Sequence, residues 1–392
     1  MMVWWATKHF HLPAQRHGSF QQRATLVNVK LKWVKDRPLD HVVSRQRHLQ
    51  LVHRLVERIS SDPRGGVPAH DLPRRPLALG HRSLLSSDFL LRYPAIFRRS
   101  SIDCFHLTDE AFHLRELELH TLRDSEPDLV DRLRRLLMLT INHTLPLHTI
   151  DQLSWDMGLP SDYHKFLLPR FPQFFSIRQP DNDERIWLKL VSRDPALSVS
   201  ELQRSHGENG SEGECLTFPV SFTRGFALRR KCMMWLQEWQ TLPYTSPYSD
   251  PSGLDPRTDV SEKRIVGVFH ELLHLTIAKK TKRMNFSNLR KPLQLPQKFT
   301  KVLERHPGIF YLSQKLGVQT VVLREAYSGG RELLRKHPLE SIRERYVAMM
   351  KVGRPERKRR SRRSGEVEGD SSEDEDGICT HTCEDQDQHI CA

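Results

Sequence analysis

The chain has 392 residues, of which 38% are apolar, and it carries a formal net charge of +13. That apolar content is enough to build hydrophobic cores, which excludes a chain that is disordered throughout. No stretch approaches the roughly 18 consecutive apolar residues of a transmembrane helix, so we expect no membrane-spanning segment.

The positive charge lies in the first 365 residues. Residues 366–392 hold ten acidic residues and no Lys or Arg, so leaving them out raises the net charge from +13 to +23. A surface with that excess repels itself unless it meets a polyanion, and nucleic-acid phosphates are the usual one. A basic surface without a ligand is the alternative. Three of the six cysteines also fall within residues 366–392, so we expect no disulfide framework and a reducing compartment.

The N-terminal segment has the composition of an organelle-targeting peptide. Residues 1–35 contain six Lys or Arg residues and no acid, and acid-free basic leaders are typical of organelle transit peptides. Ser19 is the only serine among them, which favours the mitochondrion over the chloroplast. We therefore expect residues 1–29 to be a transit peptide, with a frayed basic terminus as the alternative.

Apolar periodicity and capping residues predict a series of helices. The first is amphipathic, because Leu49, Val52 and Leu55 recur at spacings of three residues. A short helix starts near Ser86 and ends before Pro94, since the residue preceding a proline avoids the helical region. The longer predicted helices cover residues 43–59, 127–141, 148–156, 161–172, 225–240 and 331–350, and one more begins near residue 263.

One apolar, basic, proline and aromatic phrase occurs three times. The copies are LLRYPAIF at 90–97, LLPRFPQFF at 167–175 and VLERHPGIF at 302–310. After a polar gap, a β-leaning apolar segment follows each copy, at residues 104–107, 186–188 and 321–323. Self-similarity on this scale is typical of stacked supersecondary units. It predicts a mainly α fold of helical repeat-like units, with a short β-hairpin after each proline signature.

The positions of the repeats predict how the chain is divided into a domain, its units and a tail. We expect a domain over residues 30–350 with units at about 43–108, 127–193 and 217–327. Residues 194–216 have no apolar period, so we expect a linker or surface insertion there. Residues 351–392 are expected to form a disordered tail, first basic and then acidic. That tail contains five potential metal ligands without apolar surroundings, which suggests incidental metal affinity: Cys379, His381, Cys383, His389 and Cys391.

Four segments together resemble the plant organelle RNA recognition domain, called the PORR domain. They are LKWVKDRPLDHVV at 31–43, FTRGFALRRKCMMWLQEWQTLPYTSPY at 222–248, LDPRTDVSEKRIVGVFHELLHL at 254–275 and LPQKFTKVLERHPGIFYLS at 295–313. The resemblance implies a nuclear-encoded plant protein that enters mitochondria or chloroplasts, binds group II introns and promotes their splicing. It implies no catalytic residue and no cofactor. The insertion at 194–216 and the tail after 351 depart from the family pattern.

Basic residues near the three signatures, and a basic and aromatic cluster near residue 226, are the predicted RNA contacts. Cations neutralise phosphates, and aromatic rings can stack on unpaired bases. The candidates are Arg92, Arg98, Arg99, Lys165, Arg170, Arg178, Arg224, Phe226, Arg229, Arg230, Lys231, Lys298, Lys301 and Arg305. The expected partners are single-stranded or structured organellar intron RNA and other splicing factors. Five further aromatics are expected in the core instead: Phe97, Phe175, Trp235, Trp239 and Phe310.

Residues 270–274, HELLH, match the HExxH pattern of zinc metalloproteases. In that pattern two histidines one helical turn apart bind zinc, and the glutamate is the general base. On a helix that starts near Lys263, however, His270 and His274 fall opposite the apolar arc. We therefore expect these two side chains to face water or a partner rather than a buried metal.

The repeat also argues against a metal at this motif. Aligning LLMLT at 136–140 with LLHLT at 272–276 places Arg134, Arg135 and Met138 at the positions of the three motif residues. Thr281 occupies the spacing at which a metzincin has its third ligand. We therefore expect no metal and no enzyme, with a zinc metallopeptidase and a helical-repeat scaffold for acidic proteins as the alternatives.

Overall fold

Three small antiparallel sheets share one strand order, in which the first strand along the chain pairs with the third and the third with the second. A computed structural model describes residues 31, 33–71, 87–100, 104–180, 183–207, 215–223, 226 and 230–352. The sheets are β1 (Val67–Pro68), β3 (Cys104–Leu107) and β2 (Phe97–Arg99); β4 (Thr144–Pro146), β6 (Trp187–Leu190) and β5 (Phe175–Arg178); β7 (Lys280–Lys282), β9 (Thr320–Leu323) and β8 (Phe310–Ser313). The predicted transit peptide and most of the predicted tail lie outside the described residues.

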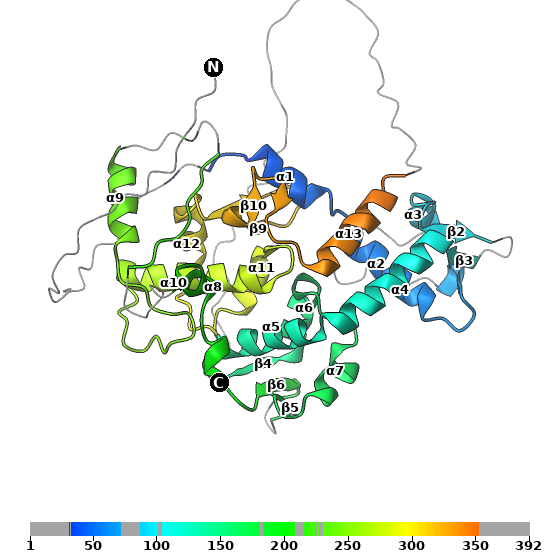
Figure 1. Ribbon diagram of the computed structural model, residues 1–392, viewed down its shortest axis with the longest axis horizontal. Helices are drawn as coiled ribbons and strands as arrows, with labels where there is room; N and C mark the ends of the chain where they lie inside the picture. Colours follow the sequence, from blue (N-terminus) through cyan, green and yellow to red (C-terminus); the bar gives the residue numbers. More distant parts are fainter. Residues whose placement is uncertain are drawn as a thin grey trace, which may run out of the picture. The chain divides into compact units, whose positions relative to one another are not determined.

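A long helix precedes each sheet, and a short helix precedes each hairpin (Figure 1). We call these segments unit 1 (49–107), unit 2 (126–190) and unit 3 (259–323). The long helices are α2 (Leu49–Ser60), α5 (Glu126–Met138) and α10 (Asp259–Leu275). The short ones are α3 (Ser87–Leu91), α7 (Tyr163–Phe166) with η2 (Leu168–Arg170), and α12 (Thr300–Arg305). Each hairpin begins at the last aromatic residue of its proline signature, so the predicted hairpins are confirmed.

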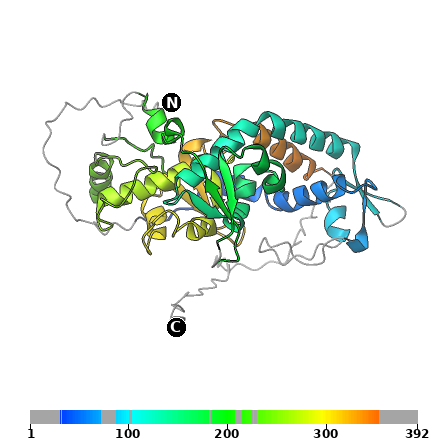
Figure 2. The same ribbon diagram turned by 90° about the horizontal axis from the view of Figure 1, so that it is seen from below.

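The fold is mixed α/β and is not a linear helical array. In such an array each repeat contacts only its neighbours, whereas here one apolar core extends from Leu49 to Met350. The last described helix, α13 (Pro338–Met349), packs against α2 and against α4 (Asp109–Asp124), which follows unit 1. Figure 2 shows these three helices side by side. The expectation of a mainly α repeat protein is corrected because each unit also holds a three-stranded sheet and the units share one core.

From their long helices to residues 158 and 294, units 2 and 3 are related by a shift of 136 residues, which takes LLMLT at 136–140 onto LLHLT at 272–276. The shift falls to 135 at the proline signatures and to 133 at the strands β6 and β9. The shift of 136 residues takes β4 onto β7 and the start of α6 (Leu147–Met157) onto the start of α11 (Arg283–Asn288). It also pairs residues with positive φ: His143 (52°) with Lys279 (50°), and Gly158 (82°) with Gln294 (52°). The two units therefore repeat in backbone conformation as well as in sequence.

These two units pack against each other through reciprocal contacts. The amide of Ile141 donates to the carbonyl of Pro292 (3.1 Å), and the equivalent amide of Ile277 donates to the carbonyl of Asp156 (2.8 Å). Asn288 donates to the side chain of Gln152, and these two positions are also equivalent. Contacts that exchange in this way are the signature of a two-fold interface. Units 2 and 3 thus form an internal pseudo-dimer.

The remaining elements connect or cover the units. They are α1 (Arg37–Ser44), η1 (Ala69–Asp71), η3 (Pro195–Leu197), α8 (Glu201–Ser205), α9 (Arg230–Gln240), η5 (Arg324–Ala326), β10 (Tyr327–Ser328) and β11 (Glu332–Leu333). The helix predicted over 43–59 is interrupted, because His48 adopts a left-handed conformation (φ 68°) between α1 and α2. None of the described helices combines the length and apolarity that crossing a bilayer requires.

Part of the segment expected as a surface insertion, residues 194–216, is instead structured. Ser200 and Gln203 form a capping box that starts α8, and Leu202 is buried against the core. The backbone amide of Glu201 donates to the carboxylate of Glu271 on α10 (2.8 Å). An apolar period cannot predict a helix this short, because its local capping and tertiary contacts determine it.

Candidate nucleic-acid interface

The predicted cations of unit 1 are on the surface. Arg92 follows α3, and Arg98 and Arg99 lie on β2; all three are exposed. Phe97 precedes them and is buried, 3% exposed, in the shared core. The burial of Phe97 therefore attaches the hairpin to the core, while Arg98 and Arg99 lie on the surface.

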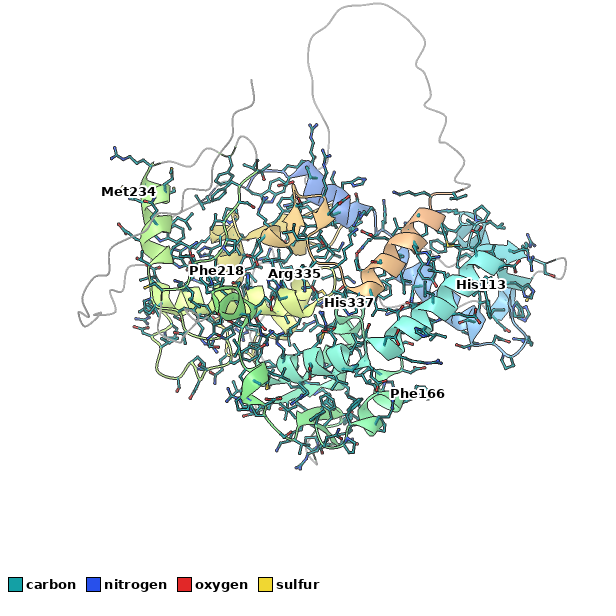
Figure 3. The ribbon with its side chains drawn as sticks, in the orientation of Figure 1. His113, Phe166, Phe218, Met234, Arg335 and His337 are labelled. Atoms are coloured by element: carbon teal, nitrogen blue, oxygen red, sulfur yellow. The ribbon has the colours of Figure 1, made fainter. Side chains whose placement is uncertain are left out.

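Unit 2 presents its predicted cations beside an exposed aromatic residue. Lys165 on α7 and Arg178 at the end of β5 are exposed, and Phe166 next to Lys165 is 68% exposed (Figure 3). Arg170 is also exposed, but its Nη1 donates to Glu126 Oε2 at 2.6 Å. Surface ion pairs of this kind are weak, so Arg170 remains available to exchange its carboxylate partner for a phosphate.

In unit 3 the structure separates the predicted cations. Lys298 and Lys301 are exposed. Arg305 is half-buried: its Nη1 lies 2.7 Å from Glu262 Oε2, and its guanidinium lies over the ring of Trp235 at 5.3 Å. Its charge is already compensated within the protein. Arg305 therefore joins α12 to α10 and α9, and its role as a phosphate contact stays a prediction.

The predicted basic and aromatic cluster is only partly described. Arg224 and Arg229 lie outside the described residues, and the helix predicted over 225–240 is observed as α9 from Arg230. Arg230 and Lys231 are exposed at its start. Phe226 is half-buried and stacks on Phe222 with ring centroids 4.8 Å apart. The five aromatics expected in the core are all buried, as predicted, at 1% to 5% exposure.

The first of the two HExxH histidines does not face water. His270 is 2% exposed, and it lies 2.7 Å, through Nε2, from Oε1 of Glu325 on η5. His274 approaches the same oxygen at 3.0 Å. Burial alone would raise the pKa of Glu325, but hydrogen bonds to the two histidines outweigh burial and lower it to about 2. The prediction that both histidines face water or a partner is wrong for His270, which other elements bury, whereas His274 is half-buried beside a cavity. The period of α10 alone cannot reveal which elements cover it.

Glu325 is a potential third ligand that the sequence argument missed, because it lies 51 residues beyond His274. One nitrogen from each histidine and one oxygen from Glu325 lie within 4.8 Å of one another, as a transition metal would require. The separations are also those of direct hydrogen bonds. The cluster can therefore act without a metal, as a polar clamp between α10 and η5.

The glutamate of the motif is not available for catalysis. Glu271 is fully buried; its Oε1 accepts from Tyr248 (2.6 Å) and pairs with Arg135 on α5. Burial raises its pKa, but the charge of Arg135 together with the hydrogen bonds from Tyr248 and the backbone of Glu201 outweighs burial, so the net shift of the pKa is downward. A general base needs reach to its substrate. Glu271 instead fixes the packing of α10 against α5.

A cavity of about 670 Å³ adjoins the histidine cluster and is lined by charges of both signs. Arg335 and His337 border it (Figure 3). Lys279 donates to the carbonyl of His274 (2.6 Å), and burial together with the nearby Arg132 lowers its pKa to about 7. Because its cations alternate with Asp128, Glu201 and Glu325, this cavity does not favour a polyanion.

A second cavity, about 530 Å³, lies between units 2 and 3, and none of the described residues that line it is acidic. We call it the inter-unit cleft. Its basic side chains are Arg185, Arg290, Lys291 and His148, and Trp187 forms part of its wall. None of these five residues was among the RNA contacts predicted from the sequence. The dibasic pair before Pro292 was a visible signal, but it lies outside the repeated signatures.

Comparisons with known proteins agree with the resemblance noted from the sequence. The model of the plant organelle RNA recognition domain matches residues 34–355. Protein WHAT'S THIS FACTOR 9, mitochondrial, of Arabidopsis thaliana is 33% identical over 88% of this chain and 91% of its own. Protein WHAT'S THIS FACTOR 1 homolog, chloroplastic, of Oryza sativa is 32% identical over 86% and 69%. No solved structure matches significantly. The chain belongs to the plant organelle RNA recognition domain family.

Proposed function

We propose that this chain is a noncatalytic RNA-binding protein that promotes group II intron splicing in a plant organelle. The observation that carries the proposal is the family match over 34–355, together with exposed cations on all three units. Bound to unpaired intron segments, the protein would stabilise the splicing-competent fold of the RNA, because a ligand shifts an equilibrium toward the conformer it prefers. The intron itself supplies the chemistry.

The mitochondrion is the proposed compartment. The acid-free leader with a single serine supports it, as does similarity to a relative whose name says mitochondrial. Other relatives are named chloroplastic, so the chloroplast is the alternative. Fusion of residues 1–35 to a fluorescent protein distinguishes the two: import into chloroplasts alone would contradict the mitochondrial assignment.

Immunoprecipitation of the tagged chain from organelles, followed by sequencing of the bound RNA, tests the function. We expect enrichment of intron sequences over exons and over ribosomal RNA. In plants that lack the protein, the same introns should remain unspliced. Normal maturation of every organelle transcript in such plants would contradict the proposal.

The noncatalytic assignment is supported by the burial of Glu271 and its pairing with Arg135. We expect intron RNA affinity to be unchanged after dialysis against a chelator, with metal content measured before and after. A loss of affinity that zinc restores would instead support a metal held by His270, His274 and Glu325. A matched His274→Ala variant would then lose the zinc response.

A protein-binding role is a second candidate, and one face of helix α4 favours it. Phe112 and Leu119 are seven residues apart, which places them on one face of the helix, and they are 47% and 40% exposed, beside the exposed His113 (Figure 3). Other splicing factors could dock there while RNA occupies the basic surfaces. Competition separates the roles: unlabelled single-stranded RNA should displace intron RNA and leave a partner bound to α4 in place.

A further inference from the structure

We propose that the inter-unit cleft binds an unpaired segment of the intron RNA, with phosphates at Arg290 and Lys291 and a base against Trp187. This inference rests on the proposed function and names the site within it. The cleft was not among the surfaces that the repeated signatures pointed to. Its volume of about 530 Å³ is in the range of sites that enclose small ligands, about 300 to 1,000 Å³.

Charge is the first argument for this ligand. Arg290 and Lys291 make no side-chain hydrogen bond or ion pair to any described residue, so no described carboxylate compensates either cation. Arg185 is exposed but already paired, with Nη2 2.7 Å from Asp183 Oδ2. Two cations without a carboxylate partner among the described residues, beside one paired cation, attract a polyanion. In the larger cavity, acids among the lining residues offset the cations.

The walls of the cleft supply the contacts that an unpaired base requires. Trp187 is half-buried, and Asp183 Oδ2 accepts from its Nε1 at 3.0 Å, which holds the ring in place. The guanidinium of Arg185 lies 5.4 Å from the ring centroid. Amide side chains of Asn142, Gln152 and Asn288 provide donors and acceptors for base edges. Aromatic stacking next to neutralised phosphates is how proteins hold single strands.

The internal two-fold supplies an independent argument. A cleft on one side of this axis has a counterpart on the other. The counterpart, formed in part by the equivalent residues Asp151, Ser154 and Trp155, is a smaller cavity of about 360 Å³ that Leu339 and Arg343 of α13 border. Trp155, which the shift of 136 residues places on Lys291, lies under the guanidinium of Arg343 at 3.6 Å. Gly158, equivalent to Gln294, lies close to Leu339 on α13.

No residue of α13 lines the inter-unit cleft. Of the two equivalent cavities, the one that α13 does not border is therefore the larger. Because this cavity carries basic rather than aromatic residues at the equivalent position, its occupant is expected to be anionic.

Binding of a single-stranded intron fragment to the full chain tests the proposal. We expect the double variant Arg290→Glu, Lys291→Glu to lose about 10-fold in affinity at moderate salt, with a salt dependence shallower by about 1.4 in log–log slope. The variant Lys315→Glu, Arg331→Glu makes the same charge change at exposed positions outside the cleft. It should lose less than about 3-fold. Trp187→Leu should lose about 10-fold with little change in salt slope.

Crosslinking provides a readout that does not depend on variants. Intron RNA with 4-thiouridine, irradiated on the wild-type chain, should crosslink to peptides that contain residues 185–187 and 287–292. Duplex RNA of the same sequence should compete at least about 10-fold more weakly, because its bases are already stacked.

The outcomes separate this inference from the proposed function. If the wild-type chain binds no intron RNA, the proposed function fails, and this site with it. If the wild type binds and both charge-reversal pairs lose equally, the cleft assignment alone is overturned. Polyglutamate that competes as well as single-stranded RNA would also overturn it, since that result indicates an acidic protein partner.

Discussion

At the scale of single residues, the fold depends on buried ionisable side chains that hydrogen-bond to other groups of the protein. Helix α10 buries Lys263 completely, and its Nζ donates to the carbonyls of Gln240 (2.8 Å) and Leu242 (2.6 Å). His306 is likewise buried against Glu262, 2.8 Å away. Removing one member of such a pair leaves an unsatisfied buried group, which costs more than the pair contributes.

Glu118 should make stability depend on pH in the acid range. Its Oε1 lies 2.5 Å from His53 Nε2, and its Oε2 accepts from Arg115 at 2.8 Å. Burial raises its pKa, but hydrogen bonding and charge from His53 and Arg115 lower it to about 2. A carboxyl group with a depressed pKa stabilises the fold above its unfolded pKa, near 4.5, and loses that contribution as pH falls toward 2.

The measurement is the free energy of unfolding of Glu118→Gln and wild type between pH 7 and pH 3. We expect the variant to be less stable at pH 7 and the difference to shrink below pH 4.5. Glu116→Gln on the same helix is the control, because Glu116 is exposed and should change little at any pH. An equal loss at pH 7 and pH 3 would contradict the assignment.

At the scale of elements, the contacts between equivalent helices determine how the units assemble. Arg135 on α5 and Glu271 on α10 occupy equivalent positions and form a buried ion pair. The hydroxyl of Tyr248 donates to the same carboxylate. One pair near the internal two-fold thus connects both units to the segment that follows α9.

Breaking this pair should be costly. Arg135→Met or Glu271→Gln alone should destabilise the protein by about 3 to 5 kcal/mol, because each leaves a buried charge without its partner. The double variant Arg135→Met, Glu271→Leu should recover part of that loss. Urea unfolding of the four proteins checks this, and strictly additive losses would show that the two residues do not interact energetically.

Prediction from sequence worked best for elements that their own residues specify. The hairpins follow the proline signatures, and the helices at 127–141 and 148–156 appear as α5 and α6. The strands β1, β4 and β7 were not predicted, because strands of two or three residues carry no period of their own. Helix α4 was not predicted either. Because the apolar residues Phe112, Leu117 and Leu119 lie on exposed faces of the helix, its apolar residues do not follow the helical period that marks a buried face.

At the scale of the whole molecule, helix α13 packs against α2, which lies near the start of the described residues. Tyr346 on α13 is fully buried, with its ring centroid 6.0 Å from that of His53 on α2. Because the three units share one core, unfolding should be cooperative rather than unit by unit.

Truncation of Tyr346 tests this packing. Tyr346→Ala should cost about 3 to 5 kcal/mol and should lower hydrogen-exchange protection in α2 and α4 as well as in α13. Lys351→Ala, at an exposed position just after α13, is the control and should change neither. Loss of protection confined to α13 would indicate that the helix is a peripheral addition.

The sequence alone determined the family, the positions of the hairpins, the starts of helices α3, α5 and α6 and the concentration of positive charge before residue 366, because these depend on neighbouring residues or on composition. Only the tertiary structure decided which charges remain free. It paired Arg305 with Glu262, placed the HExxH histidines against Glu325, and left Arg290 and Lys291 open in the inter-unit cleft. The reason is physical: whether a cation is available to RNA depends on the carboxylates that folding places beside it, and those come from distant parts of the chain.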